Sequence, residues 1–214
     1  MSTSFESRTV LWLGLALIAC GCAPLNPDGG EPVVHSMDSV KLISPSISDA
    51  NDPSCYMQDS YSISDSNRLL LRFEELSQDA PNVVTNGQTV QFTVTLENSS
   101  DSKHAATDLR LCYLTTDWMM LATWTKAHPF GGDQGSWSQP GGDYSQCISP
   151  SGVDSSGVAS FDVTTWFIND IQDRGTNDGF ILMASDIHPI VIYGDKSMES
   201  SPRMLWNGTV SNLH

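Results

Sequence analysis

Apolar and polar residues alternate most regularly between Thr89 and Glu97. The apolar positions share one face and the polar positions the other: Val90, Phe92, Val94 and Leu96 against Gln91, Thr93 and Thr95. A period of two is typical of a β-strand with one buried face. The same pattern predicts strands over 69–74 and 109–114.

Shorter apolar segments predict further strands, and turn-forming residues separate them. These segments are 158–163, 180–184, 190–193 and 204–210. Val40 to Ile43 reads equally well as a first strand or as linker. Between Thr164 and Asp173 the apolar residues recur at helical spacing, which predicts one short helix. Many strands and one helix predict an all-β fold, a jelly-roll-like β-sandwich.

The N-terminus has the layout of an export signal. Arg8 precedes an apolar run from Val10 to Ala19, which is too short to span a bilayer. Its last residues, Leu17-Ile18-Ala19-Cys20, resemble the bacterial lipobox, in which cleavage leaves a lipid-modified cysteine. The resemblance implies a mature chain that starts at Cys20 and is anchored to a membrane by its lipid. Cys22 as the modified residue and an ordinary secretory signal are the alternatives.

The segment after the signal is rich in proline, serine, aspartate and glycine, with prolines at 24, 27, 32, 45 and 53. Such a composition is typical of a flexible linker. We therefore expect a signal peptide over 1–19, a lipidated N-terminus and tether over 20–52, and a β-sandwich domain over 53–214.

Charge narrows the range of partners. The chain of 214 residues carries a formal net charge of −15. It should be repelled by nucleic acid and by anionic polymers. We expect no nucleic-acid partner and no cofactor, and a neutral polysaccharide as the glycan most compatible with this charge. A structural calcium ion stays open.

Cysteine usage allows one disulfide in the folded part. Export permits disulfides. With Cys20 lipidated and Cys22 in the tether, Cys55, Cys112 and Cys147 remain. We favour the pair Cys112–Cys147 because both fall inside the expected domain, although spacing alone leaves the pairing open.

Motifs for catalysis or metal binding are missing from the sequence. It contains no Gly-x-Ser-x-Gly, no His-Glu-x-x-His and no cysteine–histidine cluster with zinc spacing. The five histidines, at 35, 104, 128, 188 and 214, have no partner that spacing reveals. Residues 173–179 resemble a calcium loop but lack its distal glutamate. We predict a protein that is not an enzyme and has no metal site.

One aromatic residue differs from the others in its surroundings. We expect most of the four residues Trp118, Trp124, Trp166 and Trp206 to be core residues. Trp137 instead lies in a glycine-rich loop, with Asp143 and Tyr144 close behind. An exposed indole beside a carboxylate is suited to stacking on a sugar and accepting its hydroxyls. The alternative is that Trp137 plugs one end of the sandwich.

Four stretches, in order, resemble the DNRLRE family of β-sandwich modules, which is related to disaggregatase and to some alginate-binding carbohydrate-binding modules. They are 67–76, Trp118 with 122–125, 136–144, and 161–166 continuing through 177–182 to 201–205. The family's Asn-Tyr-Gly loop is replaced by a shorter segment, 56–67, and 193–199 matches only loosely. The resemblance implies a β-sandwich that binds carbohydrate.

Together these features predict a non-catalytic, lipid-anchored module of the bacterial cell envelope, at the outer membrane or cell surface, that binds a glycan. A structural or adhesive envelope protein with no sugar site is the main alternative. A lyase or hydrolase would need a cleft with converging acids, bases or nucleophiles, and the sequence shows no such set.

Overall fold

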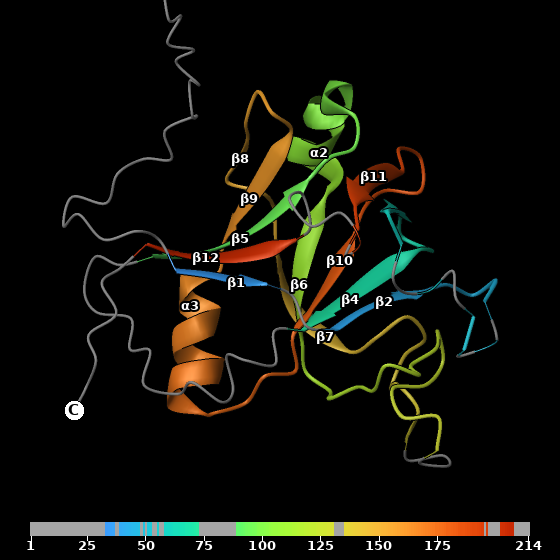
Figure 1. Ribbon diagram of the computed structural model, residues 1–214. Coiled ribbons are helices and arrows are strands. Elements are labelled where there is room, and N and C mark those ends of the chain that lie inside the picture. The colour runs from blue at the N-terminus through green and yellow to red at the C-terminus, as the bar shows by residue number, and fades with distance from the viewer. Residues whose placement is uncertain are drawn as a thin grey trace, which may run out of the picture.

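The protein is a β-sandwich, seen in a computed structural model that describes residues 33–36, 39–47, 49, 51–52, 55, 58–72, 89–130, 135–194, 196 and 202–207. The strands of the described part form two five-stranded sheets and one two-stranded sheet (Figure 1). All strand pairs in these sheets are antiparallel. The prediction of an all-β fold is confirmed at this level.

The strand order of each sheet follows from these pairings. The first sheet runs β1 (Val33–Ser36), β12 (Arg203–Asn207), β5 (Thr89–Thr95), β9 (Val158–Asp162), β8 (Gly152–Val153). The second sheet runs β2 (Ser39–Ile43), β4 (Arg68–Arg72), β10 (Phe180–Met183), β6 (Arg110–Leu114), β7 (Tyr144–Ile148). The small sheet pairs β11 (Ile190–Tyr193) with β3 (Ser60–Ile63).

The main core lies between the two large sheets. From β5 it takes the apolar face that the sequence predicted, which is fully buried. Phe92 of that face packs against Phe161 of β9 and Phe180 of β10, with ring centroids 5.9 Å and 5.8 Å away. Phe180 of the second sheet therefore packs directly against Phe92 of the first sheet.

The central strands of the second sheet, β4 and β10, are buried on both faces. Leu69 and Leu71 of β4 point into the main core, whereas Leu70 belongs to a second apolar cluster on the outer face. The loop over 115–143, described at 115–130 and 135–143, covers that outer face with Trp118, Ala122, Ala127 and Trp137. Strands with two covered faces need apolar residues at successive positions, which explains the run of three leucines.

The helices differ in part from the prediction. The expected helix is present as one turn of α-helix, α3 (Thr164–Trp166), continued by the π-helix η4 (Phe167–Asp173). A second helix, α2 (Ser102–Asp108), follows a short 3-10 turn, η2 (Ser99–Asp101), where the sequence predicted only a turn. Ala105 is the only buried residue of α2. A helix with so small an apolar face has almost no periodic signal.

The expected domain boundary at residue 53 is wrong, because β1 and β2 lie within the predicted tether. β1 pairs with β12, and β2 pairs with β4, with Val40 opposite Leu71. The sandwich thus begins by Val33. The signal peptide, Cys20 and Cys22 lie outside the described residues.

Burial lowers the pKa of Lys41 on β2, although the nearby charges of Cys55, Asp52 and Asp49 oppose this shift. Asp49, Asp52 and Cys55 therefore lie near Lys41 of the sheet. Asp49 and Asp52, which were also expected to be tether, thus belong to the domain.

Removing residues 20–49 should destabilise the domain, because it removes both strands. Burial of Val40 and Ile43 alone contributes roughly 3–6 kcal/mol, at about 1.5–3 kcal/mol for each side chain. A chain starting at residue 50 should then melt more than about 6 °C below one starting at residue 23. Thermal unfolding followed by circular dichroism measures this difference, and equal melting temperatures would contradict the assignment of β1 and β2 to the sandwich.

Candidate functional site

The loop over 115–143 joins β6 to β7 and contains Trp137 and Asp143, two of the residues expected to bind glycan, while the third, Tyr144, is the first residue of β7. The loop covers the outer face of the second sheet with buried side chains of its own. The apolar cluster beneath it contains Ile43, Leu70, Cys112, Leu114, Ile181 and Met183 from the sheet and Trp118, Ala122, Ala127 and Trp137 from the loop. The loop is therefore an integral layer of the fold.

Trp137 lies within that layer, so the expectation that it presents an open ring face is wrong. Its side chain is only 5% exposed. Its indole Nε1 donates to the Thr123 carbonyl at 2.9 Å, and its backbone nitrogen donates to the Thr125 carbonyl at 3.2 Å. Trp137 fills the space beneath the loop, as the alternative interpretation held.

Asp143 binds its own loop. Its carboxylate accepts hydrogen bonds from the Ser138 hydroxyl at 2.6 Å, the Ser138 backbone at 2.9 Å and the Gln139 backbone at 3.2 Å. A fourth comes from the Thr116 hydroxyl at 3.2 Å. Burial raises the pKa of Asp143, but these hydrogen bonds outweigh it and hold the pKa below its usual value. The carboxylate ties the two ends of the loop together.

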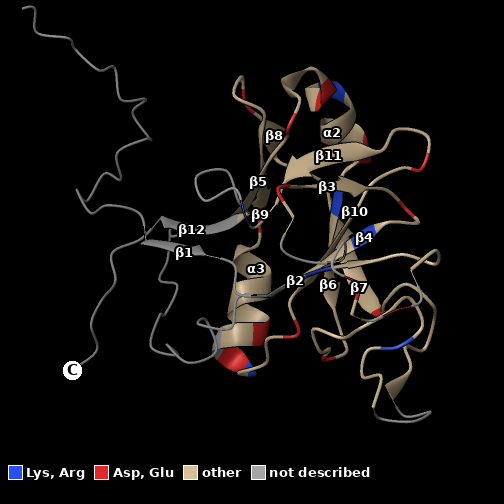
Figure 2. Ribbon diagram, turned by 45° about the vertical axis from the view of Figure 1, so that its right-hand side comes forward, with Lys and Arg blue, Asp and Glu red and all other residues tan. Residues whose placement is uncertain are grey.

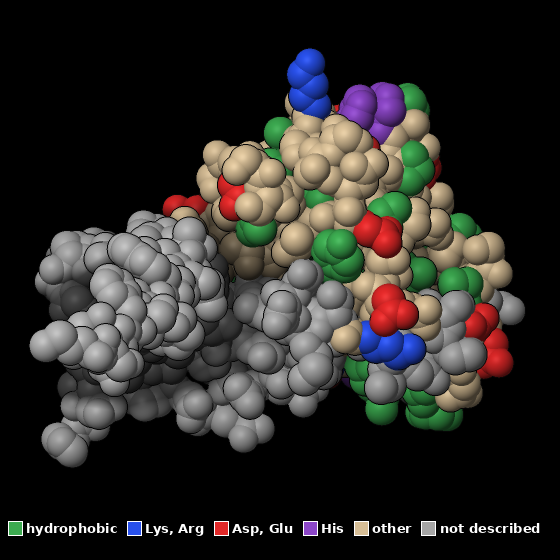
Figure 3. Space-filling view, turned by 45° about the horizontal axis from the view of Figure 1, so that its top comes forward, with side chains coloured by type: hydrophobic (Ala, Val, Ile, Leu, Met, Phe, Trp, Pro, Cys, Tyr) green, Lys and Arg blue, Asp and Glu red, His purple; other side chains and the backbone are tan. Residues whose placement is uncertain are grey.

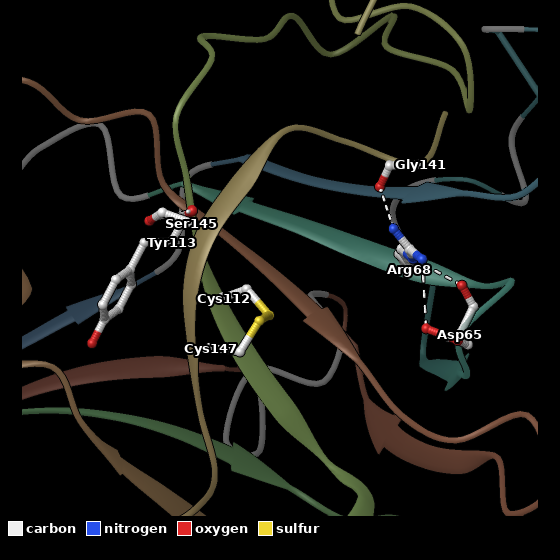
Figure 4. Close-up of a disulfide and its surroundings, with 7 residues drawn as sticks. All are labelled: Asp65, Arg68, Cys112, Tyr113, Gly141, Ser145 and Cys147. Carbon is white, nitrogen blue, oxygen red and sulfur yellow. Dashed lines mark hydrogen bonds and ion pairs between the residues drawn. A yellow bond between two sulfur atoms is a disulfide. The ribbon is translucent and has the colours of Figure 1, made fainter. Parts of the chain in front are cut away.

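Arg68 of β4 makes cation–π contacts with Trp124 of the loop and Tyr144 of β7. Its guanidinium carbon lies 5.0 Å from the centre of the Trp124 ring and 5.7 Å from that of Tyr144. The same side chain donates to the Gly141 carbonyl at 3.0 Å and to the Asp65 carbonyl at 2.8 Å (Figure 4). Tyr144 therefore contacts a cation and is only partly exposed.

Gly141 is required at the point where these groups meet. It has a positive φ of 94°, which glycine adopts without strain. A Cβ atom there would lie 2.8 Å from both Arg68 and Trp124. The glycine-rich sequence thus permits close packing of the loop.

A shallow groove runs beside Trp124. The described residues that line its volume of about 340 Å³ are Pro45, Ile47, Thr123, Trp124 and Thr125. Trp124 is partly exposed and Thr125 is exposed. The carbonyls of residues 123–125 accept hydrogen bonds from Trp137 and Gly141. These bonds fix the backbone that forms one wall of the groove. An indole, two hydroxyls and no charged side chain line this part of the groove.

Arg72, at the other end of β4, holds the start of the loop. It pairs with Asp117, donates to the Trp118 carbonyl, and its guanidinium carbon lies 4.8 Å from the centre of the Trp118 ring. The basic residues Lys41, Arg68, Arg72 and Arg110 all belong to strands of the second sheet, whereas most acidic residues of the described part lie in connections and helices (Figure 2). Two of these basic residues, Arg68 and Arg72, thus attach the loop over 115–143 to β4.

The favoured disulfide is present. Cys112 of β6 and Cys147 of β7 are directly opposite in register and joined (Figure 4). The bond fastens β7, whose side chains are largely exposed, to the second sheet. Cys55 is buried.

Sequence reasoning missed the groove at Trp124 and one group of possible metal ligands. Among the described residues, His104, Asp108 and His188 have ligand atoms within 4.8 Å of one another. His104 and Asp108 are four residues apart in the sequence, but the helix that carries them, α2, was not predicted. His188 is distant in the chain, so its proximity could not be predicted from spacing.

The sequence matches no protein-family model, and no curated protein matches it. Within the part of the chain that the structure describes, no helix combines the length and apolar character needed to cross a membrane.

Replacing Trp137 with alanine should cost roughly 3–5 kcal/mol of the free energy of unfolding, as expected for a buried tryptophan. The loss comes from a cavity in the second apolar cluster, beneath the loop, and from removal of the hydrogen bond to Thr123. Phe130→Ala is the matched control, because Phe130 is in the same loop but 78% exposed. It should change stability by less than about 0.5 kcal/mol. Denaturant unfolding measures both, and equal effects would contradict the buried position of Trp137.

Asp143→Asn should lower stability by about 1–3 kcal/mol at pH 7, since it replaces a charged acceptor of several hydrogen bonds. A carboxyl with a lowered pKa in the folded state contributes stability above its unfolded-state pKa and loses it as pH falls through the folded-state value. The difference between wild type and variant should therefore shrink on acidification through that window. Denaturant unfolding at several pH values tests this, with the exposed Asp173→Asn as control. A difference that does not depend on pH would exclude the charge of Asp143 as its source.

Proposed function

We propose that the chain is a lipid-tethered, non-catalytic module of the cell envelope that binds a neutral glycan in the groove beside Trp124. The observation that carries the proposal is the groove itself, where a partly exposed indole stands between hydroxyl and apolar side chains. Trp137 and Asp143 then stabilise the loop that shapes the groove, and Tyr144 contacts Arg68 beneath it, so none of the three contacts the sugar.

The chemistry of the groove suits an uncharged carbohydrate. The indole of Trp124 and the side chains of Pro45 and Ile47 offer apolar surface to the C–H face of a sugar ring. The hydroxyls of Thr123 and Thr125 can exchange hydrogen bonds with sugar hydroxyls. The net charge of −15 disfavours acidic polymers. The groove is shallow, which fits a chain lying along the surface better than an enclosed small molecule.

The tether and the family resemblance supply the setting. The lipobox-like sequence at Leu17 to Cys20 supports a lipid anchor, and the resemblance to DNRLRE modules supports carbohydrate binding without catalysis. The chain also crosses repeatedly between the two large sheets, as from β4 to β5 to β6 and from β9 to β10, although β6–β7 and β8–β9 stay within one sheet. These crossings support a jelly-roll connection. A module held at the cell envelope would attach the cell to a glycan.

A structural or adhesive role without a sugar site is the second candidate. The loop over 115–143 exposes Met119 by 41%, Met120 by 40% and Phe130 by 78%. Exposed apolar side chains gathered in one loop are typical of protein-contact surfaces. Under this alternative the loop would contact a protein of the envelope or of another cell.

A glycan array probed with the chain from residue 23 onward, without lipid, tests the leading proposal. We expect binding to neutral polysaccharides that is weakened by Trp124→Ala by roughly 5- to 150-fold, in line with a stacking contribution of about 1–3 kcal/mol taken by analogy from nucleobases. Thr125→Arg, which fills the groove from an exposed position, should also weaken binding by at least about tenfold while the melting temperature stays close to that of wild type.

Thr165→Arg is the matched control, because Thr165 is exposed on α3, well away from this loop (Figure 1). It should bind like wild type. Binding that survives Thr125→Arg and Trp124→Ala would move the site away from the groove. A folded wild-type chain that binds no glycan would contradict the proposal and favour the adhesive alternative.

A further inference from the structure

The topology brings helix α2 and the turn after β10 to the same end of the second sheet. α2 ends at Asp108, just before β6 begins at Arg110. Arg110 pairs with Met183, the last residue of β10, and the turn that follows contains His188. Residues about 80 positions apart in the sequence are therefore neighbours.

Two imidazoles and one carboxylate converge there. His104 and Asp108 are four residues apart on α2 and so share one face of the helix. Nδ1 of His188 lies 3.2 Å from Oδ2 of Asp108, and the ring of His188 stacks on that of His104 with centroids 4.2 Å apart. Histidine side chains lie side by side on the exposed surface in Figure 3. All three ligand atoms fall within 4.8 Å of one another.

We propose that His104, Asp108 and His188 form a binding site for a divalent transition-metal ion such as Zn²⁺. Two imidazole nitrogens and one carboxylate oxygen are a common ligand set for zinc, and imidazole also suits Cu²⁺ and Ni²⁺. Calcium prefers oxygen ligands alone, so the set selects against it. The site goes beyond the proposed function and does not depend on it.

Of the three ligands, His104 is the one that has to turn to meet a common ion. Ligands about 2.1 Å from a tetrahedral ion lie about 3.4 Å from one another. The separation between His188 and Asp108 already has that length. His104 must turn out of its stack, because two near-parallel rings do not aim their nitrogens at one point. The ring is exposed and has room to turn.

The second oxygen of Asp108 has a partner that orients the carboxylate. The hydroxyl of Thr107 lies 3.0 Å from Oδ1 of Asp108, which leaves Oδ2 directed toward His188. Outer contacts of this kind orient metal ligands in proteins. A bound ion would join α2 to the turn between β10 and β11, and with three protein ligands it would keep a coordination position open to solvent.

Isothermal titration of the full chain with Zn²⁺, without an affinity tag and after treatment with a chelator, tests the site. We expect one equivalent to bind in the presence of excess Ca²⁺, and Cu²⁺ to bind more tightly than Zn²⁺. Zinc at a hundredfold excess over its Kd should raise the melting temperature by roughly 5–11 °C.

His104→Ala, Asp108→Ala and His188→Ala should each weaken zinc binding by at least about tenfold, the lower limit for losing an outer-shell partner. His128→Ala is the control, since His128 faces a single carboxylate, that of Asp117, at 3.7 Å. Circular dichroism checks that each variant folds. Absence of saturable zinc binding, or binding unchanged in both His104→Ala and His188→Ala, would overturn the proposal. Glycan binding by those variants should match wild type, so failure of this site is distinguishable from failure of the groove.

Discussion

The structure depends on burial of the central strands of the second sheet on both faces. One face packs on the first sheet around Phe92 and Phe180, and the other is covered by the loop over 115–143. An antiparallel sheet with one solvated face would alternate apolar and polar residues, but β4 has three successive leucines and β10 is apolar at all four positions. Without the loop, a row of apolar side chains would face water. The loop is therefore required for the stability of the sheet beneath it, whatever else it does.

Attaching such a loop requires polar contacts, because its backbone groups cannot all pair with strands. Arg68 and Arg72, at the two ends of β4, each contact a loop carbonyl and an aromatic ring. Asp143 binds two backbone amides from the inside of the loop. Trp137 then holds residues 123 and 125 by their carbonyls. The side of the groove formed by residues 123–125 is thus fixed by contacts with the core and with the rest of the loop.

Sequence patterns predicted the strands that have one regular apolar face or a continuous apolar run. β5 is the clearest case, and the disulfide between Cys112 and Cys147 also followed from the expected domain. The apolar pattern did not predict elements that bury few or no side chains. β7 shows no buried face, since the disulfide and backbone pairing hold it, and α2 has a single buried alanine. The exposure of Trp137 could not be read from its glycines, because the same residues that loosen a loop also let it pack closely, as Gly141 does.

The candidate groove and the candidate metal ligands lie beside different strands at the same end of the second sheet. Leu69 of β4, Leu182 of β10 and Leu111 of β6 are opposite one another, so Arg68 and Arg110, one residue earlier in β4 and β6, share that end. Trp124 of the groove contacts Arg68, whereas α2 ends just before Arg110. The groove also adjoins the end of β2, and three inter-strand spacings, about 14 Å, separate β2 from β6. The two sites have no residue in common, and sites at such a distance without shared partners are energetically independent to a first approximation. An ion bound by α2 can therefore be gained or lost while the groove keeps its packing.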